Sequence, residues 1–209
     1  MAQMINGLFP GELTPTKTVA GCMDIFENVW PNPAETIKML DAVTATPESG
    51  VYRQRAPTIG DREFQNQRTN KQMGITHLAQ VTNNGVLQNI HNQFNLMLIA
   101  ASVPYANRYG IQGGLWHEEY NALKYSGGEE YTAHYDGDTI TGRSISALLY
   151  LNSEFEGGHT EFPHFDITLT PSPGTLVLFP SNFAYRHIAH PVTSGTKYAL
   201  VTWIKDREL

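Results

Sequence analysis

The sequence predicts an α+β fold in which N-terminal helices support a barrel-like core of eight C-terminal strands. Apolar residues recur at helical spacing in two segments before residue 110. After Gly113 the chain changes to short apolar or alternating runs separated by Gly, Pro, Asn and Asp. Regular short strands with turn residues between them are typical of a sandwich or barrel, and helices that precede strands indicate the α+β class.

The two helices are marked by their caps and their apolar spacing. The first is expected from Pro33 to Val43, where an Asn-Pro start precedes apolar residues at helical intervals. The second is expected to have Asn83 or Asn84 as its cap and to end before Pro104. The rest of the first third is interpreted as irregular, and the polar segment 60–73 fits either a surface loop or an edge strand.

Eight strands follow in the C-terminal half. We expect them at Leu115–Tyr125, Tyr131–Asp136, Ser144–Leu151, Thr160–Phe162, Asp166–Thr170, Thr175–Phe179, His187–Pro191 and Lys197–Lys205. A length of 209 residues suits one domain core and is short for two. Residues 1–209 are therefore expected to form a single domain, with 1–110 as helical and irregular support and 111–209 as the strand core.

The composition argues against several function classes. The net charge of −6 and the lack of any Lys or Arg run disfavour nucleic acid as a partner. The single cysteine, Cys22, excludes an internal disulfide, and the N-terminal residues lack the charged start and apolar run of a secretory signal. No apolar stretch approaches the roughly 20 residues that a membrane span needs. We expect a soluble, cytoplasmic monomer or homodimer without a membrane partner.

The stretch EEYTAHYDGD, residues 129–138, places an imidazole and a carboxylate two residues apart just before a glycine turn. In an extended strand His134 and Asp136 project side by side, and such a pair suits a metal ion. Two histidines and one carboxylate with open positions are the arrangement of non-haem iron(II) sites that also bind oxygen and a cosubstrate. The candidates for the missing ligand are His159, His164, His187 and His190. The last two are three residues apart and face opposite sides of a strand, so parity alone does not choose between them.

The strand KYALVTWIK places Lys197 and Trp203 on one face. If that face points inward, the Lys197 ammonium enters an apolar barrel, which costs roughly several kcal/mol unless a counter-charge meets it. A small dicarboxylate would supply that charge. Ser146 and Tyr150 share a face of RSISALLYLN and would bring a hydroxyl and a phenol beside the ammonium.

From Tyr125 to Trp203 the sequence resembles the prolyl 4-hydroxylase branch of the Fe(II)- and 2-oxoglutarate-dependent oxygenases. Six pieces match in family order and at family-like separations: YSGGEEYTAHYD, RSISALLYLN, GGHTEFP, PSPGTLVLFPSN, HIAHPV and GTKYALVTW. QRTN at 67–70 adds a short echo of the family's N-terminal region. The resemblance implies a double-stranded β-helix (jelly-roll) core of eight strands, and the compact chain looks like the small members found in bacteria and their viruses.

The resemblance also implies roles for single residues. His134, Asp136 and His187 look like the iron ligands, which leaves His190 facing away. Lys197 looks like the partner of the far carboxylate of 2-oxoglutarate. The expected cofactor-binding set is completed by Tyr125 and Tyr150 from the resemblance and by Ser146 from strand parity.

Two further residues, Arg143 and Trp203, sit where relatives contact the peptide substrate. Arg143 has the opposite parity from Ser146 and is therefore expected to act from the mouth of its strand. His159 and Glu161 form another His-x-Glu pair at strand spacing, which we expect on the outer face of the core.

The implied activity is hydroxylation of a prolyl residue in a peptide or protein. The reaction would use bound Fe(II), consume 2-oxoglutarate and O2, and release succinate and carbon dioxide. Ascorbate is the expected reductant. One alternative keeps this cofactor chemistry but acts on a non-prolyl side chain or a small molecule, because fold and cofactor do not fix the substrate. The other is a non-catalytic metal-binding β-helix module, which the intact ligand set and the inward Lys197 disfavour.

Overall fold

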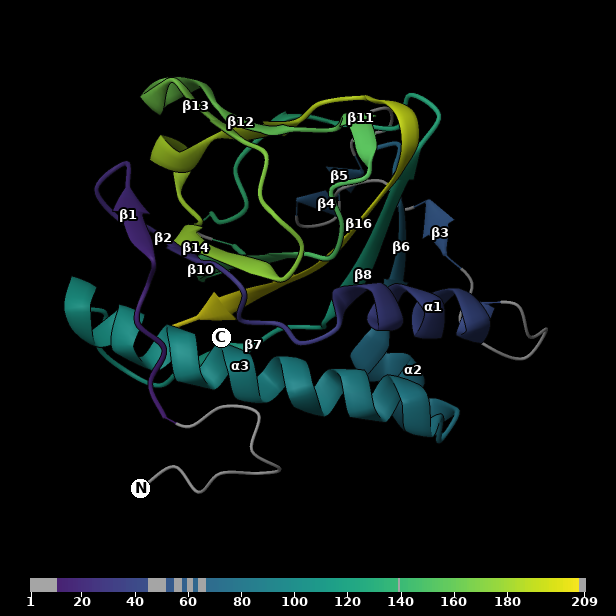
Figure 1. Cartoon of the computed structure of the whole chain (residues 1–209). Helices are drawn as coiled ribbons and strands as arrows, with labels where there is room; N and C mark the ends of the chain where they lie inside the picture. The colour runs from purple at the N-terminus through teal and green to yellow at the C-terminus, as the bar shows by residue number, and fades with distance from the viewer. Residues whose placement is uncertain are drawn as a thin grey trace.

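Of the two main antiparallel sheets, the larger lies between the smaller sheet and the helices (Figure 1). This computed structural model describes residues 11–44, 52–54, 58–59, 62–63, 67–138 and 140–206. The helices are α1 (Pro33–Thr44), α2 (Ile75–Val81) and α3 (Gly85–Tyr109), with two 3-10 turns, η1 (Pro163–Phe165) and η2 (Phe183–Tyr185). No helix in this part of the chain is both long and apolar enough to cross a membrane.

Ten strands form the larger sheet. Their order is β1 (Lys17–Val19), β2 (Met23–Phe26), β14 (Thr175–Pro180), β10 (Arg143–Tyr150), β16 (Val192–Lys205), β8 (Asn121–Ser126), β6 (Lys71–Gly74) and β3 (Arg53–Gln54), while β7 (Trp116–His117) and β11 (Phe155–Gly157) pair with β16. The smaller sheet has the order β13 (Ile167–Leu169), β12 (Thr160–Phe162), β15 (His187–Ala189) and β9 (Tyr131–His134). A separate pair joins β4 (Thr58–Ile59) to β5 (Arg62–Glu63).

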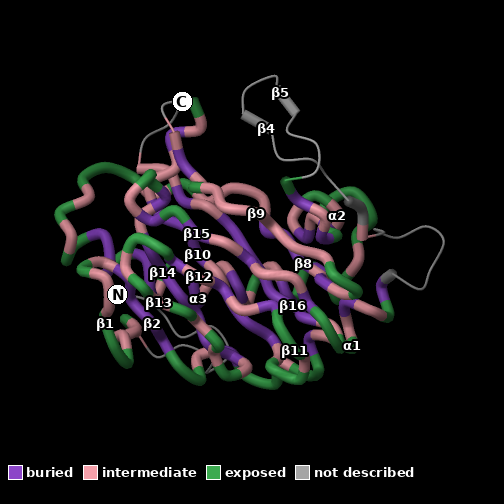
Figure 2. Tube along the Cα trace, turned by 90° about the horizontal axis from the view of Figure 1, so that it is seen from above, coloured by how far each residue is buried: buried purple, intermediate pink, exposed green. Residues whose placement is uncertain are grey.

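Alternation along the central strands divides the core into two layers. Ala147 and Leu149 of β10 face the helices and pack in a cluster with Phe94 of α3. Tyr150 and Phe179 face the smaller sheet instead. Figure 2 shows the buried residues running along these central strands. Two facing antiparallel sheets with helices under one of them match the predicted jelly-roll architecture.

Helix α3 continues through Pro104 to Tyr109, so the expected end before Pro104 was wrong. A proline inside a helix leaves the carbonyl four residues earlier without its usual donor. Here the backbone N–H of Leu13 donates to that carbonyl, Ala100 O, at 2.8 Å. A tertiary contact thus repairs the helix. The expected cap is confirmed, because the Asn84 side chain accepts from two backbone N–H groups of the first turn.

The first third is less irregular than its sequence indicates, because β1 and β2 extend the larger sheet. Helix α2, which follows soon after it, was not predicted either. Strand β2 is short and contains a fully buried acid, Asp24, which hides its strand pattern. Asp24 accepts hydrogen bonds from Thr18, Arg108 and Tyr109. Within the ambiguous segment 60–73, residues 71–73 belong to β6, and residues 60–61 and 64–66 lie outside the described part of the chain.

Candidate metal centre and its pocket

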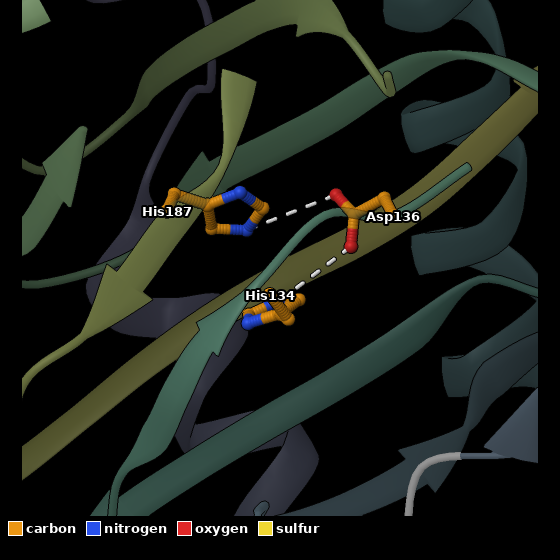
Figure 3. A group of neighbouring side chains, drawn as sticks. All are labelled: His134, Asp136 and His187. Carbon is orange, nitrogen blue, oxygen red and sulfur yellow. Dashed lines mark ion pairs between the residues drawn. The ribbon is translucent and has the colours of Figure 1, made fainter. Parts of the chain in front are cut away.

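Three of the predicted residues converge where β9 ends and β15 begins (Figure 3). His134, the last residue of β9, lies directly opposite His187, the first residue of β15. Asp136 follows in the bend after β9 and points between the two rings. Asp136 Oδ1 is 3.6 Å from His134 Nε2, and Oδ2 is 3.8 Å from His187 Nε2. The predicted side-by-side placement of His134 and Asp136 is therefore seen.

Each imidazole is oriented by a backbone carbonyl two residues earlier. His134 Nδ1 lies 2.7 Å from Thr132 O, and His187 Nδ1 lies 3.1 Å from Tyr185 O. Because a carbonyl oxygen only accepts, Nδ1 of each ring carries a proton and donates it, which turns Nε2 toward Asp136. Such carbonyl partners are the usual way in which metal-binding histidines are held in one tautomer.

The protonation states of the cluster suit a metal. Burial lowers the pKa of His187 to about 4, and repulsion from His134 acts in the same direction, so the ring is neutral at pH 7. Burial by itself would raise the pKa of Asp136, but His187, His134 and the Ser146 hydroxyl hold it well below its usual range. Two imidazoles and one carboxylate are the donor set that fits iron(II) while leaving positions open for other ligands.

Lys197 points into the pocket, so the condition on which the sequence argument rested, an inward face, is met. It is 3% exposed and lies opposite Tyr125 in the β16–β8 pair. Its ammonium donates to Gly158 O at 2.5 Å and to Thr160 Oγ1 at 3.4 Å, and it lies 5.4 and 5.3 Å from the ring centroids of Tyr125 and Tyr150. Burial lowers its pKa to about 8. Among the described residues no carboxylate pairs with this ammonium.

Of the other expected cofactor-binding residues, Tyr125 and Ser146 line the same pocket, and Tyr150 lies beside its Lys197 ammonium. The Tyr150 hydroxyl donates to Thr160 Oγ1 at 2.9 Å. Burial raises the pKa of Tyr125 to about 12, which keeps its phenol protonated and able to donate. Ser146 differs from its expected place: its hydroxyl is hydrogen-bonded to Asp136 and to Ser181 Oγ, not to the ammonium.

Arg143 and Trp203 lie together at the edge of the site. The guanidinium carbon of Arg143 is 3.8 Å from the Trp203 ring centroid, Nη1 donates to Asp136 O at 3.1 Å, and Nη2 donates to Glu118 at 2.7 Å. The parity argument for Arg143 was wrong because a bulge shifts the β10–β16 register between Arg143 and Ile145. The bulge turns Arg143 toward the Trp203 side of the sheet.

Sequence reasoning did not name three residues that line the pocket: Arg68, Tyr131 and Thr160. Arg68 lies in the QRTN segment and donates to Asn70 Oδ1 at 2.7 Å. Tyr131 stacks on the His134 ring with centroids 3.4 Å apart. Tyr131 lies within YSGGEEYTAHYD and Thr160 within GGHTEFP, so all three residues fall inside the quoted family-like segments.

His190 does not join this cluster, in keeping with its expected outward direction. Its Nε2 lies 2.6 Å from Glu161 Oε2, and its ring stacks on His159.

Residues 120–205, which include the whole donor set and Lys197, match the family model described as the 2OG-Fe(II) oxygenase superfamily. These residues form a 2OG-Fe(II) oxygenase domain.

Known relatives of this oxygenase domain include prolyl 4-hydroxylases. Prolyl 4-hydroxylase 13 of Arabidopsis thaliana is 30% identical over 121 residues, which cover 44% of this chain and 44% of that protein. The chain spans about half the length, or less, of the curated relatives that it matches.

Solved structures confirm the double-stranded β-helix fold of the oxygenase domain. The viral collagen prolyl hydroxylase of Paramecium bursaria Chlorella virus-1, solved with 2OG, superposes with a TM-score of 0.62 at 18% identity and covers 88% of this chain and 96% of that one. A Trichoplax adhaerens prolyl hydroxylase, solved with a peptide fragment of the hypoxia inducible factor oxygen degradation domain, gives 0.67 at 16% identity, with coverage of 90% and 84%.

Proposed function

We propose that this chain is an Fe(II)- and 2-oxoglutarate-dependent dioxygenase that hydroxylates a prolyl residue in a peptide or protein, releasing succinate and carbon dioxide. The observation that carries the proposal is the sharing of one pocket by two groups. One is the His134, Asp136 and His187 donor set, and the other is the buried Lys197 ammonium, which meets no carboxylate within the described part of the chain. A metal and a diacid together satisfy both groups.

His134, Asp136 and His187 would hold Fe(II) through two Nε2 atoms and one carboxylate. When bound, the iron supplies the redox chemistry that couples decarboxylation of 2-oxoglutarate to transfer of one oxygen atom of O2 into a substrate C–H bond. The Nδ1–H···O=C bonds of both histidines and the Ser146 hydroxyl on Asp136 fix the donors before the metal arrives.

Lys197 would bind the far carboxylate of 2-oxoglutarate. The buried ammonium pays its desolvation cost before binding, so a charge-assisted hydrogen bond to the cosubstrate contributes about 1.5–3 kcal/mol. The rings of Tyr125 and Tyr150 lie 5.4 and 5.3 Å from that ammonium, and their phenols would donate to the same cosubstrate. Leu123, Leu148 and Val201 line the same pocket and exclude water from it.

Arg143 and Trp203 would contact the peptide substrate. The guanidinium bonds to the backbone carbonyl of Asp136, so it lies next to the donor set. The Trichoplax prolyl hydroxylase was solved with a peptide fragment, and the curated relatives include prolyl 4-hydroxylases. Together these similarities favour a prolyl peptide over a small molecule as the substrate. We also propose ascorbate as the reductant that restores iron(II).

The test incubates the protein with Fe(II), 2-oxoglutarate and ascorbate, with and without proline-containing peptides, and follows succinate. The expected result is peptide-dependent succinate formation and a mass gain of one oxygen atom on proline. A gain on another residue, with prolyl peptides unchanged, would replace the substrate assignment. Neither succinate formation nor 2-oxoglutarate binding would overturn the enzyme assignment as a whole. Without ascorbate, succinate formation should stop after fewer turnovers.

A further inference from the structure

A second cluster of metal-type donors lies on the outer face of the smaller sheet. It consists of His159, Glu161 and His190, and we call it the outer cluster. Thr160 and Ala189 pair across β12 and β15 and are buried, so the residues on either side of them point outward. His159 and His190 come opposite each other, and the His190 N–H donates to His159 O at 3.0 Å.

The three side chains of the outer cluster are already close together. Their ligand atoms lie within 4.8 Å of one another, the same limit that encloses the His134, Asp136 and His187 set. Glu161 Oε2 is 2.6 Å from His190 Nε2, and the two imidazole rings stack with centroids 4.1 Å apart. Exposed fractions of 31% for the His190 side chain and 34% for that of Glu161 leave the cluster open to an ion from solvent.

The geometry points to a second metal site, in which the outer cluster binds a divalent transition ion of the zinc type. Two imidazoles and one glutamate are a donor set that zinc uses, with nitrogen and oxygen donors at about 2.0–2.2 Å. The donors come from β12 or from the residues directly next to β12 and β15, so rotation of the side chains would bring them onto a shared ion. Imidazole nitrogens favour zinc, nickel and copper over magnesium and calcium.

An ion in the outer cluster would clamp β12 to β15 directly behind the pocket. Between His159 and Glu161 lies Thr160, whose Oγ1 accepts hydrogen bonds from Tyr150 and Lys197. The strand β15 carries His187 three residues before His190. The outer ion would therefore brace both strands that shape the pocket without touching it, which predicts greater thermal stability when it binds.

Calorimetric titration with Zn²⁺ alone counts the ions that the metal-free full chain binds. The melting temperature with and without Zn²⁺ measures the stabilisation. Wild type should bind two ions, one in each cluster, and melt at a higher temperature with Zn²⁺. Glu161→Gln and His190→Ala should each lose one ion, or lose at least about tenfold in affinity at one site. His187→Ala should also lose one ion but keep the one that the outer-cluster variants lose.

The matched control is His77→Ala, which removes an exposed histidine on α2 and should leave both ions bound. Equal Zn²⁺ stoichiometry and affinity in Glu161→Gln, His190→Ala and wild type would overturn the second site. So would a single bound ion in wild type that His187→Ala abolishes. Because the readout is zinc binding, the outcome is independent of whether the oxygenase activity proposed above is found.

Discussion

The Ser146 hydroxyl donates a hydrogen bond of 2.6 Å to Asp136 Oδ2 and thereby ties the bend after β9 to the centre of β10. Ser146 is 1% exposed, and its hydroxyl is also hydrogen-bonded to Ser181. The carboxylate is therefore held by a group that need not touch the metal. Partners of this kind orient metal ligands, and their loss typically weakens metal binding by roughly 10- to 100-fold.

Ser146→Ala should accordingly weaken Fe(II) binding by about one order of magnitude while changing the free energy of unfolding by only about 1 kcal/mol. The measurement is a titration with Fe(II) under anaerobic conditions, together with chemical denaturation. Ser144→Ala at the neighbouring bulge is the control and should bind iron as wild type does. Unchanged iron affinity in Ser146→Ala would show that the hydrogen bond does not position Asp136.

Replacement of Lys197 tests the cosubstrate site. Lys197→Met keeps the length of the side chain but removes the charge, so the KM for 2-oxoglutarate should rise roughly 10- to 150-fold, the equivalent of about 1.5–3 kcal/mol. Folding should not suffer, because the variant removes a buried ammonium that has no acidic partner among the residues that the structure describes. Succinate formation against 2-oxoglutarate concentration and the melting temperature are measured together. A lower melting temperature with unchanged KM would make Lys197 a structural residue.

The same ammonium predicts a pH dependence of stability. Burial lowers the pKa of Lys197 to about 8 from the ordinary 10.5. Between these two values the unfolded chain binds more protons than the folded one at this position, so its contribution to stability rises with pH. Below pH 8 the desolvation cost is present in full, and above pH 10.5 it is gone.

Lys197→Met isolates this effect from other groups that titrate in the same range. The stability of the variant relative to wild type should be greatest at pH 7 and should shrink as the pH approaches 10.5. Denaturant unfolding of both proteins across this range measures the difference. A constant difference would mean that the folded-state pKa of Lys197 is not lowered.

Arg143 is expected to serve the peptide and not the cosubstrate. Arg143→Met should raise the KM for a prolyl peptide by at least tenfold, the size of about 1.4 kcal/mol, while 2-oxoglutarate binding stays within about twofold. Arg143→Lys should recover little, because an ammonium cannot stack on Trp203 and bond to Glu118 and Asp136 O at once. Peptide-saturation kinetics and direct 2-oxoglutarate titration separate the two effects. If the affinities for the peptide and for 2-oxoglutarate fell equally, Arg143 would support the structure of the whole site and would not serve the peptide specifically.

Local pattern was enough for much of this site. Strand alternation predicted His134 beside Asp136, and the two side chains meet although β9 ends at His134. Alternation also put Lys197 and Trp203 on one face, and both line the pocket. The Asn84 cap was equally local. The prolyl hydroxylase resemblance then separated His187 from His190, which parity had left open, and the structure brings His187 to the cluster.

Other features depend on partners that a single stretch of sequence does not show. The bulge after Arg143 reverses its direction, and it is visible only in the pairing of β10 with β16. Helix α3 passes Pro104 because Leu13, far away in sequence, supplies the missing donor. The His159 and Glu161 pair gains His190 only through the register of β12 against β15. Each case is a tertiary contact that overrides or completes a local signal.

The contrast between His187 and His190 is the sharpest test of the two clusters. His187→Ala removes a donor from the pocket cluster, so it should abolish Fe(II) binding and turnover. His190→Ala removes a side chain whose ring contacts Glu161 and His159 on the outer face. Iron affinity and turnover should stay within about threefold of wild type, because a small distortion of β15 costs less than a lost ligand. Anaerobic Fe(II) titration and succinate formation are measured for both variants. Loss of iron in His190→Ala with retention in His187→Ala would reverse the ligand assignment, because each histidine reaches only one of the two faces of the smaller sheet.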